Sequence, residues 1–132
     1  MIGLDTNVLV RYLAQDEQLQ SAVATQLIEG NLTAGAQGFV SVVTLIEVVW
    51  VLQGCYKCTK EEVLEILGRL LRVKQLVVQD AEIVWQAVRV FKAGQADFSD
   101  CLIERMGHAH ECEYTVTFDK AAVKTTGMRL LS

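Results

Sequence analysis

Several carboxylates stand where they could hold a metal ion or act together on a substrate. Asp5 ends one predicted strand, and Asp119 follows another. Asp97 and Asp100 lie at the start of a predicted helix. In parallel sheets, ligands bind beyond the carboxyl ends of the strands. The positions therefore predict that these acids lie at the same edge of a sheet.

Glu47 is the most informative single acid, because the segment over residues 42–52 is otherwise almost entirely apolar. A charge in such a helix is costly unless something compensates it. Taken alone, each acid has an ordinary alternative. Glu47 could pair with an arginine or lie at a rim, and Asp5 could cap a helix. Asp100 could complement a helix dipole, and Asp119 could be a turn residue.

Together, the acids indicate a cation. Carboxylates about 5 Å apart would repel by roughly 3 kcal/mol per pair at an effective dielectric near 20. A fold accepts that cost where a divalent ion offsets it, and oxygen-only ligands favour Mg²⁺ or Mn²⁺ over zinc. Two such ions would also offset the net charge of −4. That charge otherwise has the wrong sign for a protein that coats nucleic-acid phosphates.

The elements that must position these acids are short apolar strands alternating with helices. Strands are predicted over residues 1–4, 39–41, 76–78 and 114–118, with an edge strand over 129–131. Helices are predicted from Thr6 and over 16–31, 42–52, 59–73, 81–92 and 99–111. Thr6, Ser41, Thr59, Asp80 and Ser99 are the predicted starts. This alternation predicts an α/β fold with a mostly parallel central sheet flanked by helices.

Length and composition favour one domain over residues 1–132. Hydrophobic residues make up 52% of the chain and the mean hydropathy is +0.29, which excludes a disordered chain. No apolar run approaches the ~20 residues that span a bilayer. The start of the chain lacks a basic region followed by a long apolar one. We therefore expect a cytoplasmic protein without a membrane segment.

The cysteines favour free thiols over disulfides or zinc. There are four, Cys55, Cys58, Cys101 and Cys112, in an apolar chain without a signal sequence. Cys55 and Cys58 have the spacing of half a zinc site. The other two are eleven residues apart and do not complete that pattern.

Four segments carry a resemblance to a known family. Residues 1–13 (MIGLDTNVLVRYL) resemble the opening of a PIN domain, the metal-dependent ribonuclease fold of VapC-type toxins. Residues 39–47, 96–103 and 115–120 resemble its second, third and fourth acidic segments. The resemblance covers essentially the full chain and implies a PIN-like three-layer fold.

The resemblance also implies roles for individual residues. The catalytic, metal-binding quartet would be Asp5, Glu47, Asp100 and Asp119. Asp97 would be either a further ligand or a helix-entry residue. Thr6, Asn7 and Thr117 could hydrogen-bond carboxylates or the attacking water, with capping or turn formation as the alternative.

The implied reaction is hydrolysis of RNA by metal-activated water, leaving 5′-phosphate and 3′-hydroxyl ends. One ion would activate the water, and a second, if present, would stabilise the leaving oxygen. No histidine is needed, so His108 and His110 are interpreted as exposed helix residues. Candidate RNA contacts are Arg11, Lys92, Lys120 and Lys124, with a solvated face as the alternative.

The implied partners are a second copy of the chain and an antitoxin that places an arginine or similar group at the acids. The helices over 20–28 and 61–71 could supply a dimer face or an antitoxin groove, or simply pack in the core. One departure from the family is Glu104-Arg105 after the third acid. Glu104 could pair with Arg105 or Lys120, or add charge near the site, which leaves the number of metal ions open.

Two other functions fit the sequence less well. An aspartate-phosphorylating phosphatase would need an Asp-x-Asp motif, and the chain has Asp5-Thr6-Asn7. A response-regulator receiver would not explain Glu47. Two alternatives remain: a PIN fold that binds RNA or protein without cutting, and a housekeeping nuclease that processes RNA.

Overall fold

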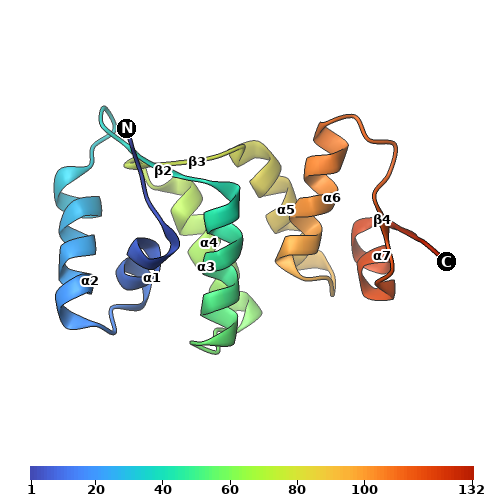
Figure 1. Cartoon of the computed structure of the whole chain (residues 1–132), viewed down its shortest axis with the longest axis horizontal. Helices are drawn as coiled ribbons and strands as arrows, with labels where there is room; N and C mark the ends of the chain where they lie inside the picture. Colours follow the sequence, from blue (N-terminus) through green and yellow to red (C-terminus); the bar gives the residue numbers. More distant parts are fainter. The chain divides into compact units, whose positions relative to one another are not determined.

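Parallel strand pairing is the feature common to both parts of the chain. The computed structural model describes residues 1–132, which divide into an N-terminal unit (Met1–Gln79) and a C-terminal unit (Asp80–Ser132). Each unit has its own parallel ladder with helices around it (Figure 1). The predicted α/β class with parallel strands and flanking helices is therefore confirmed.

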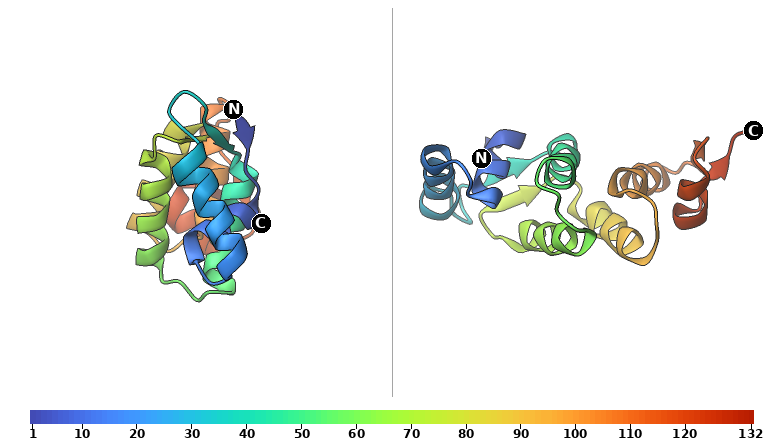
Figure 2. Two further views of the ribbon diagram at one scale, coloured as in Figure 1. Left: turned by 90° about the vertical axis from the view of Figure 1, so that its left-hand side faces the viewer. Right: turned by 90° about the horizontal axis from the view of Figure 1, so that it is seen from below.

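The N-terminal unit is built on three parallel strands in the order β1-β2-β3. Ile2 pairs with Gly38, and Phe39 with Val77, so β2 is the middle strand. Helix α4 packs on β3 and against α3 (Figure 2). The elements are β1 (Ile2–Gly3), α1 (Thr6–Ala14), α2 (Gln18–Thr25), a π-helical turn η1 (Gln26–Asn31), β2 (Gly38–Val40), α3 (Val42–Gly54), α4 (Lys60–Arg72) and β3 (Leu76–Val78).

Local capping signals set where these helices begin. The Ser41 hydroxyl accepts a hydrogen bond from the Thr44 amide at 3.1 Å, and Thr59 forms a capping box with Glu62. Both starts were predicted and are confirmed. The predicted cap at Thr6 is wrong. Asp5 takes that position, because its carboxylate accepts from the Val8 amide at 3.0 Å.

The core of the N-terminal unit comes from all of its layers. Its fully buried side chains include Leu9, Ile28, Val40, Leu45, Val48, Val63 and Leu67. The helix predicted over 16–31 is found over 18–31, but its last part is π-helical. The spacing of Leu19, Val23, Leu27 and Ile28 predicts one shared apolar face for it, and that part of the prediction is wrong. The helix is α2 followed by η1, and Leu19 and Val23 are 78% and 71% exposed. The small residues Ser21 and Ala24 are the ones that α2 buries, and α2 packs against α1.

The C-terminal unit pairs β4 with β5 in parallel, with Val116 opposite Arg129. Its elements are α5 (Ala81–Ala93), α6 (Phe98–Ala109), β4 (Val116–Thr117), α7 (Lys120–Thr126) and β5 (Arg129–Leu130). Helices α5 and α6 lie side by side (Figure 1), and the Phe91 and Phe98 rings meet edge to face at 5.8 Å. The strand predicted over 114–118 is confirmed only over Val116–Thr117. The helix predicted over 99–111 is α6, which begins one residue earlier and ends two residues earlier. Helix α7 was not predicted.

Two predicted starts in this unit differ from the structure. Asp80 precedes α5, but its backbone is left-handed (φ 49°) and its side chain makes no capping bond. Asp97, not Ser99, is at the N-cap of α6. The helix predicted over 81–92 is α5, which ends one residue later, just before Gly94.

Other sequence expectations can be checked directly. All four cysteines are free thiols. His108 lies in the last turn of α6 and His110 just after it, and both are exposed. None of the helices is long and apolar enough to cross a membrane.

Candidate metal centre

The N-terminal unit supplies two acids that one threonine connects. Asp5 lies two residues after the end of β1, next to Leu4, whose amide donates to the Phe39 carbonyl at 2.9 Å. Glu47 lies on α3, 42 residues later in the chain, and its Oε1 accepts from the Thr6 hydroxyl at 2.7 Å. Because Thr6 is the neighbour of Asp5, this bond holds Glu47 near the end of β1.

The sequence argument that Glu47 is costly to bury is corrected by its position. Glu47 is exposed. It lies on the solvent face of α3 with Val43 and Trp50, which are 70% and 61% exposed. The buried face of the same helix carries Leu45 and Val48. The apolar run is therefore wider than the buried face, and the carboxylate needs no compensation for burial.

The C-terminal unit supplies three acids, of which Asp97 and Asp119 act on Asp100. Asp97 is at the N-cap of α6, yet its side chain makes no capping hydrogen bond. Asp100 is half-buried in the first turn of α6. Burial raises the pKa of Asp100, and the negative charges of Asp97 and Asp119 raise it further. The three carboxylates are thus close enough to repel.

Asp119 follows β4 and also shapes the next helix. Its carboxylate accepts from the Ala121 amide at 2.9 Å, which caps α7. Its own amide donates to the Thr117 hydroxyl at 3.0 Å. The hydroxyl of Thr117 thus fixes the backbone at the end of the strand, and Asp119 has a cap role in place of the turn role considered from the sequence.

The donor chemistry of these acids suits a hard cation. In neither unit do three or more His, Cys, Asp or Glu side chains come together as a metal site. The acids form an N-terminal pair, Asp5 and Glu47, and a C-terminal trio, Asp97, Asp100 and Asp119. All donors are carboxylate oxygens, which Mg²⁺ and Mn²⁺ prefer. The effect of Asp97 and Asp119 on Asp100 is one that a divalent ion would relieve.

The comparison with protein families decides the classification. The PIN domain family model matches residues 2–127. The chain belongs to the PIN domain family. It is also 27% identical over 126 residues to a VapC ribonuclease of Aquifex aeolicus (strain VF5), which covers 92% of this chain and 93% of that protein. PIN domains are typically nucleases and are generally metal-dependent.

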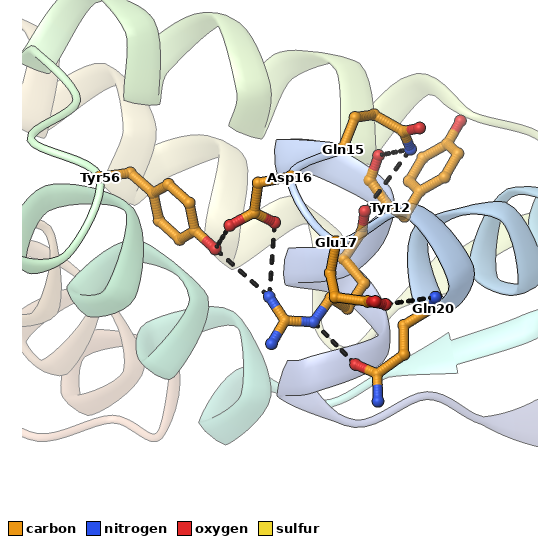
Figure 3. Close-up of polar contacts among 7 residues, drawn as sticks. Tyr12, Gln15, Asp16, Glu17, Gln20 and Tyr56 are labelled. Carbon is orange, nitrogen blue, oxygen red and sulfur yellow. Dashed lines mark hydrogen bonds and ion pairs between the residues drawn. The ribbon is translucent and has the colours of Figure 1, made fainter.

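Arg11, a candidate RNA contact of this PIN domain, is engaged within its own unit. Its Nε donates to Gln20 at 2.8 Å, and its Nη1 lies 3.4 Å from an oxygen of Asp16. The Tyr56 hydroxyl donates to the other Asp16 oxygen at 2.7 Å (Figure 3). The hydrogen bond from Tyr56 is the main reason that the pKa of Asp16 is lowered, and Arg11 contributes less.

The remaining predicted residues of the PIN domain are exposed. Asn7 lines a cavity of about 290 Å³ beside Asp5. Lys92, Lys120 and Lys124 lie on the surface of the C-terminal unit. These positions leave the three lysines accessible to a ligand.

The departure from the family at Glu104 has a simple structural counterpart. Two hydrogen bonds, of 2.7 and 3.0 Å, join Arg105 to the Glu104 carboxylate. These bonds raise the pKa of the Arg105 guanidinium. Of the two pairings considered from the sequence, Glu104 thus makes the one with Arg105, and its charge is already balanced.

Proposed function

We propose that this PIN domain is a Mg²⁺- or Mn²⁺-dependent endoribonuclease, the toxin of a toxin–antitoxin pair. One observation carries the proposal. In each unit an aspartate lies two residues after a strand of the parallel ladder, Asp5 after β1 and Asp119 after β4, and a helix carries a further acid, Glu47 or Asp100. The relation to a VapC ribonuclease supports RNA as the substrate.

In this proposal, one or two cations are held by Asp5, Glu47, Asp100 and Asp119, with Asp97 as a further ligand. The bound cation supplies positive charge that activates water and stabilises charge on the scissile phosphate. Thr6 orients the Glu47 carboxylate through its 2.7 Å hydrogen bond. Thr117 fixes the backbone of Asp119. Both are positioning residues, in line with the importance of such partners in metal sites.

A non-cleaving module that binds RNA or protein is the second candidate. The complete set of acids weighs against it, since a binding module has no need of repelling carboxylates such as Asp97, Asp100 and Asp119. A housekeeping nuclease would use the same acids, so it differs from the toxin only in its substrate and its partner.

The proposed antitoxin contact lies in the N-terminal unit. The cavity beside Asp5 is lined by Val8, Val23, Ala24 and Leu27, with Asp5 and Arg11 among its few charged residues. Leu19 and Val23 are exposed on α2. This surface suits an apolar helix that places a basic group beside Asp5. The same apolar surface is the proposed dimer face if the chain self-associates.

A cleavage assay with the purified chain tests the proposal. Structured RNA should be cut with Mg²⁺ or Mn²⁺ to give 5′-phosphate and 3′-hydroxyl ends, and chelation should stop the cutting. Asp5→Asn should reduce the rate by about 100-fold or more, since losing about 3 kcal/mol of charge stabilisation has that effect. Its fold should persist, because asparagine caps helices as well as aspartate does.

Asp80→Asn is the matched control. Asp80 is exposed, its side chain caps nothing, and its left-handed backbone suits asparagine. This variant should cut RNA at the wild-type rate. Binding of RNA without cleavage in either metal would favour the non-cleaving module. Full activity of Asp5→Asn would remove Asp5 from the chemistry.

A further inference from the structure

A second cavity lies entirely within the C-terminal unit. Its volume is about 520 Å³. Its lining includes Arg89, Ala93, Gly94 and Gln95 from α5 and the turn after it, and Lys124 and Thr125 from α7. We call it the Arg89–Lys124 cavity. Arg89 was not singled out from the sequence, because its partner in the cavity lies on α7, which was not predicted.

A close approach at Gly94 builds this cavity. A Cβ atom at Gly94 would lie 2.1 Å from Cγ2 of Thr125, so only glycine allows the turn to come this near to α7. The Thr125 hydroxyl then accepts hydrogen bonds from the Gln95 and Ala96 amides, at 3.0 and 3.2 Å. These contacts bring Arg89 and Lys124 to one cavity, although they are 35 residues apart in the chain.

The charge of the cavity is unbalanced by the protein. No carboxylate lines it, and neither Arg89 nor Lys124 makes an ion pair. Arg11 and Arg105, in contrast, are paired with Asp16 and Glu104. The chain has more acidic than basic residues, with a net charge of −4, so an excess of basic residues does not explain two unpaired cations at one cavity. Both side chains are exposed, so they are accessible to an anion from outside the chain.

The position of the cavity points to the kind of anion. Asp119 caps α7 at one end, and Lys124 lies five residues further along, so the two are about 8 Å apart along the helix axis. A stacked nucleic-acid strand rises about 3.4 Å per nucleotide, so it covers this distance in roughly two to three nucleotides. An RNA strand with one phosphate at the acids thus brings another phosphate near the cavity.

We propose that the Arg89–Lys124 cavity binds a backbone phosphate of the RNA, roughly two to three nucleotides from the scissile one. The inference rests on the proposed function, of which it specifies the substrate contact. Arginine offers a planar fork for phosphate and lysine a compact charge. The Thr125 hydroxyl, which accepts two amide bonds, still has its own hydrogen to donate. The cavity would fix the register of the strand without reading its sequence.

RNA binding is the direct test, and cleavage must be blocked while it is measured. We suggest the Asp5→Asn background in Mg²⁺, a fluorescent single-stranded oligoribonucleotide, and fluorescence anisotropy over a range of salt. Adding Arg89→Ala and Lys124→Ala should weaken binding about tenfold or more, as the loss of a charge-assisted phosphate contact does. The slope of log affinity against log salt should fall by about 0.7 for the lost phosphate.

A matched double variant distinguishes a specific phosphate site from the general effect of removing two positive charges. Arg69→Ala with Lys74→Ala removes the same two side-chain types from exposed positions of the N-terminal unit. It should change the Kd less than twofold, because exposed charges that do not line the cavity act only through the weak, screened overall field. Lys124→Arg keeps the charge and should retain most of the binding.

The outcomes distinguish the two proposals. Three results would overturn the cavity site. The first is an equal loss of RNA affinity in both double variants, and the second is an unchanged affinity after Arg89→Ala with Lys124→Ala. The third is no RNA binding by the Asp5→Asn protein. If binding depends on Arg89 and Lys124 but the wild-type chain cuts no RNA, the cavity assignment stands and the nuclease proposal fails. If the wild-type chain cuts RNA and its RNA affinity does not depend on Arg89 and Lys124, the nuclease proposal stands and the cavity assignment fails.

Discussion

The two units each cap a helix with their strand-end aspartate, Asp5 or Asp119, but they hold their helix-borne acids, Glu47 and Asp100, differently. In the N-terminal unit, Asp5 and Glu47 are exposed, and each accepts a hydrogen bond from the chain, from the Val8 amide and the Thr6 hydroxyl. In the C-terminal unit, Asp100 is half-buried near two like charges, which with burial raise its pKa. The first pair is satisfied by the protein itself. The second group is the one with electrostatic repulsion left for a cation to relieve.

The largest effect that follows from this contrast is on cleavage. Asp100→Asn should reduce the cleavage rate about 1,000-fold or more, because it removes a charge that lies close to two others and contacts the cation directly in our proposal. Glu47→Gln should reduce the cleavage rate about 10- to 100-fold, the range for groups that orient or support ligands. The effect is smaller because one Glu47 oxygen already accepts a hydrogen bond from Thr6. Single-turnover rates at saturating Mg²⁺ measure both.

Thr6→Val sharpens the same contrast. It keeps the shape of the side chain and removes only the bond to Glu47, so it should resemble Glu47→Gln in rate. Equal reductions of the cleavage rate in Asp100→Asn and Glu47→Gln would mean that the different surroundings of the two carboxylates do not affect the rate of cleavage.

The next effect is on stability and concerns the helix caps. Asp5→Ala should lower the free energy of unfolding by about 1 kcal/mol, because the Val8 amide loses its acceptor. Asp97→Ala should stay within about 0.5 kcal/mol of wild type, because Asp97 caps nothing. Urea denaturation without divalent ions measures both. A larger loss in Asp97→Ala than in Asp5→Ala would reverse the assignment of which acid is structural.

The elements that were predicted well are those with local signals. Ser41 and Thr59 begin helices because a hydroxyl directly before an apolar stretch can accept from the amide three residues later. The strands β2 and β3 are short apolar runs between helices, a pattern that any buried parallel strand shows. For the acids, the rule that strands end at one edge named Asp5 and Asp119 as strand-end residues.

The errors came from tertiary context. Leu19 and Val23 lie outside because α2 packs against α1 through the face that carries Ser21 and Ala24, and no local pattern shows that the smaller residues form the buried face. Glu47 was expected to be costly because its neighbours are apolar, but a helix with one free face can carry apolar residues such as Trp50 in solvent. The Arg89–Lys124 cavity depends on how Gly94 meets Thr125, which only packing decides.

A smaller effect is expected for Asp100 without metal. Asp100→Asn should raise the Tm at neutral pH, because it removes like-charge repulsion from Asp97 and Asp119 and the cost of keeping a half-buried charge. The gain should be at most about 4 °C, which corresponds to less than about 1 kcal/mol. Calorimetry in EDTA measures it, and Mg²⁺ should stabilise the wild type more than the variant. A lower Tm in EDTA would show that the Asp100 carboxylate stabilises the fold.

The smallest effect concerns Asp16, the N-terminal carboxylate with the clearest protein partners. The Tyr56 hydrogen bond, and to a lesser degree Arg11, lower its pKa from the usual 3.8 (Figure 3). Because the folded protein then binds this proton more weakly than the unfolded chain does, the contribution is complete above about pH 4. It is lost as the pH falls through the lower, folded pKa. The Tm difference between wild type and Asp16→Asn should therefore be small, largest above about pH 4, and should vanish in stronger acid.

Tyr56→Phe identifies the cause of that pH dependence. It removes the 2.7 Å hydrogen bond to Asp16 and leaves Arg11 at 3.4 Å from the same carboxylate. If the hydroxyl dominates, Tyr56→Phe should flatten the dependence of Tm on pH nearly as much as Asp16→Asn does, while Arg11→Gln should flatten it less and high salt should change it little. A larger effect of Arg11→Gln, abolished by salt, would mean that the ion pair holds this carboxylate. In that case a positive charge, that of Arg11, would stabilise an acid of the N-terminal unit. A bound cation has the same role for Asp100 in our proposal, so the two units would differ less in how they stabilise their acids.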